Sequence, residues 1–256
     1  MERKIDSYAY KSKLRKINPA FKVIFAFLTL LICIIADNIY VSLAIIVSMG
    51  FITIFKGGIK FHEYMSLMSI PLVFMILGSI AIAFGVSMSP IGDYNLHLCG
   101  FYLYTSDENI MKTIEIVIKA FGAISAMYMM TLSTNISEII SVLRKAHIPK
   151  IIIELMSMIY RFIFILIDVQ CKMKNSAQSR LGYIDFKTSC YSFGSTASNL
   201  LIVSLKKANT YYNAMESRCY NGDMLFLEEE KKVKTIHVVL ACIYFSILIF
   251  IWYIAK

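Results

Sequence analysis

The chain has 256 residues, of which 58% are hydrophobic, and 26 lysines and arginines against 17 acidic residues give a formal net charge of +9. Apolar residues make up about half of an ordinary soluble domain, so this share and a mean hydropathy of +0.65 exclude that class. Apolar runs of about 20 residues recur, which predicts an all-α integral membrane protein. Because the basic residues flank these runs, the positive charge indicates membrane orientation rather than binding to nucleic acid.

Five segments are expected to cross the membrane: 21–36, 39–55, 64–87, 110–132 and 235–254. Lys56 and Lys60 place the loop between the second and third spans inside. No lysine or arginine lies between Lys60 and Lys112, so the long loop 88–109 is expected outside. The N-terminus then lies in the cytoplasm of a multi-pass protein of the cell membrane. The first 20 residues are polar and charged, so no cleavable signal peptide is expected.

Local signals predict the start of the first helix and, separately, a charged pair within the fourth span. Asn18 and Pro19 are expected to begin the first span, with Asn18 as the cap and Pro19 in the first turn. Glu115 and Lys119 stand four residues apart in the favourable order, which predicts an ion pair on one helix face.

The segment 133–234 differs in kind because basic residues return throughout it. We expect three helices here, at about 136–147, 149–180 and 195–219, which form a cytoplasmic platform at the membrane interface. The chain is therefore divided into a four-span membrane domain at 1–132, a coupling domain at 133–234 and a last transmembrane helix at 235–256. Arg161, Asp168 and Lys172 share one face of the second helix, and we expect this polar strip to contact other protein.

A short phrase, Asn-x-x-(Gln/Glu)-Ser-Arg, occurs twice in this segment, at 175–180 and at 213–218. Each copy ends a long helical pattern, and glycine follows at Gly182 and Gly222, which is a signal of a helix C-terminus. The sequence therefore predicts two helix ends, each of which carries one arginine, Arg180 or Arg218. The alternative interpretation is a chance repeat on a solvated helix face.

The chain contains no GxxxxGK(S/T), HExxH, GxSxG or GxGxxG motif, so no catalytic residue is expected. Its six cysteines include no CxxC pair, and the close pair His97 and Cys99 is weak evidence for a metal site. We expect no resident metal or cofactor. The chain has no nucleotide-binding motif of its own, and its two equivalent basic helix ends suit a partner that is present in two copies. Arginine suits such a contact because its guanidinium group forms several directed hydrogen bonds.

Several pieces of the chain together resemble the transmembrane T component of energy-coupling factor (ECF) transporters. They are Leu14-x-x-Ile17-Asn18-Pro19-x-x-Lys22, the section from Thr131 to Pro149 followed by Tyr160-Arg161-Phe162, and Ala214-Met215-x-x-Arg218-x-Tyr220-x-Gly222. The phrases that end at Arg180 and Arg218 resemble the paired Ala-Arg-Gly signatures of that family. Here serine replaces the alanine, at Ser179 and Ser217. Leu181 and Cys219 replace the glycine, which puts the turn geometry in doubt.

The resemblance implies a non-catalytic subunit of an importer in which two crossed coupling helices contact two ABC-type ATPases. It implies that Ser179, Arg180, Leu181, Ser217, Arg218 and Cys219 dock the ATPases, and that Arg161, Asp168 and Gly222 support the coupling helices. The other partners implied are a substrate-binding membrane S component, a small accessory membrane subunit in the cobalt type, and membrane lipid, with no nucleic acid. The chain is most like the cobalt-uptake type.

Two alternatives stay open at this point. One is the T component of an importer for a vitamin. The other is a membrane enzyme or an assembly protein without a role in transport.

Overall fold

The computed structural model describes residues 8–10, 12–83, 85–87, 94–98, 101–105, 107–146, 148–220 and 231–255. It divides into two compact units. The first comprises Met1–Val142 together with Glu230–Lys256, and the second is Leu143–Glu229. The boundary between the two units falls within the short helix expected near 136–147, between Val142 and Leu143.

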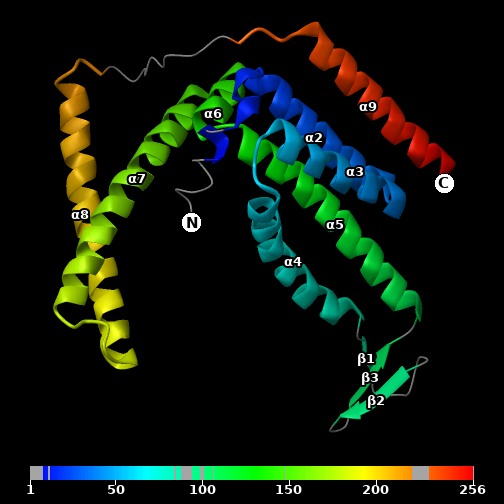
Figure 1. Ribbon diagram of the computed structural model, residues 1–256. Coiled ribbons are helices and arrows are strands. Elements are labelled where there is room, and N and C mark those ends of the chain that lie inside the picture. Colours follow the sequence, from blue (N-terminus) through cyan, green and yellow to red (C-terminus); the bar gives the residue numbers. More distant parts are fainter. Residues whose placement is uncertain are drawn as a thin grey trace. The chain divides into compact units, whose positions relative to one another are not determined.

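Helices dominate the first unit (Figure 1). They are the 3-10 helix η1 (Lys13–Lys16), α2 (Pro19–Ala36), α3 (Ile39–Phe51) with its π-helical continuation η2 (Ile52–Lys56), α4 (Phe61–Ala83), α5 (Asp107–Ser133), α6 (Ile136–Lys145) and α9 (Thr235–Ile254). Five segments are long and apolar enough to cross a membrane: Pro19–Ala36, Ile39–Lys56, Phe61–Ile80, Asn109–Ser133 and Thr235–Ile254. The expected all-α membrane fold and its five spans are confirmed.

Asparagine caps begin the first two spans. The side-chain oxygen of Asn18 accepts hydrogen bonds from the amides of Ala20 and Phe21 at 2.9 and 3.3 Å, and Pro19 takes the first helical position, as expected. Asp37 ends α2 in the left-handed conformation (φ 43°), and Asn38 then caps α3. A polar pair is thus sufficient to turn the chain between two spans.

The core of the first unit lies where α2 and α3 pack against α5 (Figure 1). Buried small residues meet at this crossing, among them Cys33 of α2, Ser42 of α3 and Ala126 of α5. A Cβ atom added to Gly122 of α5 would lie 3.0 Å from Cys33 Sγ and 3.3 Å from the Ser42 carbonyl oxygen. Small residues therefore allow the three helices to approach closely, as in other membrane bundles.

We expect Gly122→Val to destabilise the first unit by about 1–3 kcal/mol, because the added carbons overpack this crossing. Thermal unfolding of the chain in detergent measures the effect. Gly78→Val of α4 is the matched control, because a Cβ atom at Gly78 has no neighbour within 4 Å. Equal unfolding temperatures for the two variants would contradict this account of the packing.

Helix α9 is attached to the rest of the first unit by aromatic and polar contacts. The rings of Tyr244 and Phe245 lie 5.3 and 5.5 Å from that of Phe25 on α2. The Tyr244 hydroxyl also forms a hydrogen bond of 2.9 Å with Ser48 on α3. These contacts hold the last span against the first two.

Two details of the first unit differ from the sequence-based expectation. Helix α4 ends at Ala83 rather than at 87, and the expected loop 88–109 contains strands. An antiparallel sheet of order β1-β3-β2 is formed by β1 (Gly85–Ser87), β2 (Tyr94–Leu98) and β3 (Phe101–Thr105). The aromatic residues and threonine of β3 favour a pleated strand. Cys99 of the weak metal motif lies outside the described residues.

The expected pair of Glu115 and Lys119 is replaced by a different ion pair. The Lys119 amine lies against the carboxylate of Asp37, and Glu115 is exposed on α5. An exposed pair along one helix is worth only a few tenths of a kcal/mol. Asp37, fixed in the turn between α2 and α3, is therefore able to compete for the same lysine.

The second unit contains two long helices, α7 (Lys150–Ser179) and α8 (Phe186–Glu216), which run in opposite directions and cross in Figure 1. The Tyr220 hydroxyl donates to Glu154 at 3.1 Å, and the rings of Phe162 and Tyr211 lie 5.7 Å apart. Helix α8 begins at Phe186, nine residues before the expected 195. The glycine at 194 weakens the helical pattern there, but nothing packs against it, so the helix runs through it.

Candidate functional site: the paired arginine turns

The first copy of the repeated phrase ends α7 in a turn that reverses the chain. The amides of Arg180 and Gly182 both donate to the carbonyl of Ala177, at 3.1 and 2.9 Å. The amide of Leu181 donates to the carbonyl of Gln178 at 3.0 Å, and Leu181 takes a left-handed φ of 60°. This is the Schellman arrangement of a helix C-terminus.

The second copy ends α8 in the same way. The amides of Arg218 and Tyr220 both donate to the carbonyl of Met215, at 3.0 and 3.1 Å. The amide of Cys219 donates to the carbonyl of Glu216 at 3.0 Å, and Cys219 has a φ of 61°. The two turns therefore share the same hydrogen bonds and the same left-handed residue.

Burial follows the same order in both turns. Ala177 and Met215, which accept the two closing hydrogen bonds, are partly buried, as are Gly182 and Tyr220. The four residues between them are exposed in each copy. The sequence repeat is thus a repeat of structure, and each copy exposes four residues, of which the serine and the arginine are identical.

The left-handed residue is the one that follows each arginine, Leu181 or Cys219, and not the glycine that the sequence analysis used as the helix-end signal. Gly182 has a different reason to be glycine. A Cβ atom there would lie 2.6 Å from Ser192 Oγ on α8 and 2.9 Å from the Ala177 carbonyl. Gly222 lies outside the described residues.

Two substitutions in the first turn are expected to have opposite effects. A left-handed conformation costs a residue with a Cβ atom about 1–2 kcal/mol, so Leu181→Gly should stabilise this helix end by about 1 kcal/mol. Gly182→Ala should destabilise it, because its Cβ atom overlaps Ser192 and Ala177. Hydrogen exchange at the amides of the last turn of α7 measures both effects. Slower exchange in Gly182→Ala than in Leu181→Gly would contradict the geometry.

The arginine side chains extend from these turns into the surroundings. Both Arg180 and Arg218 are exposed, and no contact within the described part of the chain occupies either guanidinium. The hydroxyls of Ser179 and Ser217 donate back to carbonyls of their own helices, at 3.0 and 3.1 Å. Each turn therefore offers a planar group of five N–H donors, which suits carboxylates and carbonyl oxygens of a partner.

The two arginines lie at opposite ends of the helix pair. Tyr220, two residues after Arg218, contacts Glu154 near the start of α7. Arg180 follows Glu154 by 26 positions on the same helix, which corresponds to about 39 Å at 1.5 Å per residue. A single small pocket of a partner cannot contact both arginines.

Of the residues expected to support the coupling helices, Arg161 and Asp168 lie on α7. Arg161, Asp168 and Lys172 are exposed there, so the expected polar strip is accessible to a partner. Sequence reasoning missed the hydrogen bond between Tyr220 and Glu154. These two residues are 66 positions apart in the chain, so no short-range sequence pattern signals their contact.

Five apolar spans and a second unit of two long helices, each ending in an arginine turn, define a multi-pass membrane protein with a separate helical extension. Residues 10–232 match the family described as cobalt transport protein, CbiQ. The chain belongs to the CbiQ family of cobalt transport proteins.

Three individual relatives match most of this chain, and two of them carry cobalt transport names. The chain is 29% identical to an uncharacterized protein of Methanocaldococcus jannaschii, over 98% of this chain and 93% of that one. It is 21% identical to the cobalt transport protein CbiQ of Salmonella typhimurium, over 86% and 97% of the two chains. A relative from Methanocorpusculum labreanum, named as a fused cobalt transport protein CbiMQ, is 30% identical over 90% of this chain and 38% of its own length.

Proposed function

We propose that this chain is the coupling subunit of an ECF-type importer for cobalt. In this role it carries ATP-driven movement from two ABC-type ATPase subunits to a substrate-binding membrane subunit and is not itself an enzyme. The fused relative supports a second transport component as a partner, because its name joins CbiQ to CbiM in one cobalt transport protein. The cobalt names of the relatives favour cobalt over a vitamin as the substrate.

The repeated arginine turn is the observation that carries this proposal. Two turns with the same hydrogen bonds and the same exposed serine and arginine suit two copies of one partner surface. Their separation of about 39 Å along α7 allows each copy to be bound by its own subunit. A membrane enzyme would instead require convergent acids, histidines or a metal-binding motif, and the described residues hold no group of three or more metal-binding side chains.

Purification of the chain from its native membrane in mild detergent tests the proposal. We expect two ATPase subunits and a second membrane protein to be recovered with it, and ATP hydrolysis to reside in the ATPases. Catalytic turnover by the isolated chain, or recovery without any ATPase under conditions that keep the membrane partner bound, would contradict the proposal.

We further propose that the second unit faces the cytoplasm, because basic residues are concentrated there. In a background without the native cysteines, Asp185→Cys in the turn between α7 and α8 should react with an impermeant thiol reagent only after the membrane is opened. Asp93→Cys, in the loop expected outside, serves as the positive control. Labelling of Asp185→Cys in intact cells would show that the second unit faces the outside and would contradict the proposed orientation.

A further inference from the structure

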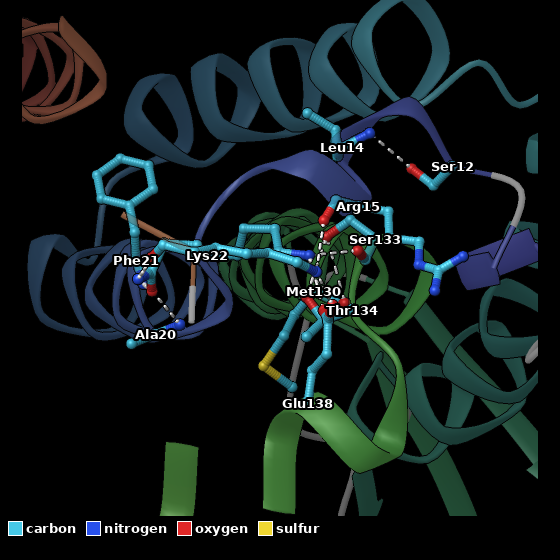
Figure 2. Close-up of polar contacts among 12 residues, drawn as sticks. Ser12, Leu14, Arg15, Ala20, Phe21, Lys22, Met130, Ser133, Thr134 and Glu138 are labelled. Atoms are coloured by element: carbon cyan, nitrogen blue, oxygen red, sulfur yellow. Dashed lines mark hydrogen bonds and ion pairs between the residues drawn. The ribbon is translucent and has the colours of Figure 1, made fainter. Parts of the chain in front are cut away.

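A buried lysine joins α2 to the junction of α5 and α6. The Lys22 side chain is only 2% exposed. Its amine donates to the carbonyl of Ser133 at 2.6 Å and lies 3.3 Å from Glu138 Oε2 (Figure 2). Ser133 is the last residue of α5, where the helix dipole favours a positive charge.

The other oxygen of the same carboxylate binds a second lysine. Lys231 lies against Glu138 Oε1 at 2.5 Å, and its amine also donates to the Arg15 carbonyl at 2.9 Å. The side-chain amide of Asn18 donates to the Lys231 carbonyl. Lys231 and Glu138 are 17% and 16% exposed, so both are largely removed from solvent.

The positions of these residues in the chain are informative. Glu138 lies five residues before Leu143, where the second unit begins, and Lys231 lies two residues after Glu229, where it ends. The segment that leads into the second unit carries this carboxylate, and the segment that leads out of it binds the same carboxylate through Lys231. Both contacts lie within the first unit. We name Lys22, Glu138 and Lys231 the lysine clamp.

We propose that the lysine clamp fixes both chain connections of the second unit to α2 and α5, with Glu138 and Lys231 as the positioning residues. A flexible connection would absorb the displacement of α7 and α8, whereas a connection that is fixed to the spans transmits it to them. With both connections held at one point, movement of α7 and α8 passes to the spans instead of being absorbed by the connections. This inference rests on the proposed coupling function and adds the place where movement enters the membrane unit.

Charge-assisted hydrogen bonds suit this task because they are short and directional. A buried ion pair adds little net stability compared with apolar packing, so a role in holding one arrangement is a better explanation of its presence. The neighbouring Lys232 provides a matched comparison, because it is exposed. The two lysines differ in their partners and not in chemistry.

Hydrogen exchange of the chain in lipid nanodiscs tests the clamp without any partner. In Lys231→Met, the hydrogen-bonded amides of α6, which begin with that of Ile139 donating to the Asn135 carbonyl at 3.0 Å, should exchange at least about tenfold faster, equivalent to about 1.4 kcal/mol of local stability. Lys231→Arg should keep most of the protection, and Lys232→Met should match the wild type. Unchanged exchange in Lys231→Met would overturn the proposal.

The assembled importer tests transmission. Lys231→Met should retain the ATPases and hydrolyse ATP, while substrate uptake per ATP hydrolysed falls at least about fivefold, a loss of about 1 kcal/mol of coupling. Unchanged uptake per ATP, or loss of the ATPases together with uptake, would overturn the proposal. A wild-type chain that binds no ATPase would instead overturn the proposed function. The exchange experiment does not depend on that outcome, because it uses the chain without any partner.

Discussion

The double variant Arg180→Ala with Arg218→Ala is expected to lose both ATPase subunits and all substrate uptake. Removal of one partner from a buried, hydrogen-bonded charged contact costs about 2–5 kcal/mol. This corresponds to a loss of roughly 30-fold or more in affinity at each turn. Co-purification of the ATPases and uptake by whole cells are the two measurements.

Single variants separate binding from coupling. Arg180→Ala or Arg218→Ala alone should still assemble through the other turn, but should transport poorly. Lysine at either position should restore little, because an ammonium group lacks the planar donor geometry of guanidinium.

A charge-matched control distinguishes docking from a general effect of positive charge. Lys174→Ala with Lys206→Ala removes one exposed positive charge from α7 and one from α8, and it should assemble and transport normally. If the double arginine variant kept both ATPases and wild-type uptake, the turns would be ordinary solvated helix ends.

Lys22→Ala is expected to destabilise the membrane unit by about 3 kcal/mol, because it leaves the buried Ser133 carbonyl and one oxygen of Glu138 without their donor. Thermal unfolding in detergent measures this change. Lys16→Ala, at an exposed position of η1, is the control and should unfold like the wild type. A difference between the two variants below about 1 kcal/mol would show that the buried amine is not needed for stability.

Local signals were sufficient to predict most of the fold. The length of the apolar runs defined five spans, and Asn18 with Pro19 defined the start of the first one. These features depend on neighbours within a few residues. The sheet of residues 85–105 was missed because it is stabilised by pairing between strands, and the composition of a single strand does not reveal that pairing.

The two helix ends of the candidate site were predicted from the sequence, but the geometry of their turns was not. The repeated phrase and the glycines that follow it predicted helix ends at Arg180 and Arg218, but not which residue of each turn takes the left-handed conformation. The left-handed conformation falls on Leu181 and Cys219, which have no intrinsic preference for it. It is imposed by the two hydrogen bonds that close each turn.

The lysine clamp could not be predicted for a different reason. Glu138 binds Lys22 and Lys231, which lie 116 and 93 residues away in the chain. Sequence reasoning treated the basic residues as markers of orientation, and that interpretation does not distinguish a buried lysine from a solvated one. The three side chains meet only in the folded chain, because Lys22 lies on α2, Glu138 on α6 and Lys231 in the segment before α9.

Site-specific photo-crosslinking tests most directly whether each arginine turn binds its own ATPase. A photoreactive residue replaces Ser179, Ser217 or both in the assembled complex, since these serines precede the two arginines and are exposed. Each single position should capture one ATPase subunit, and the double variant should capture two on the same chain. Crosslinks to the membrane partner alone, or to an ATPase from only one of the two positions, would contradict the account.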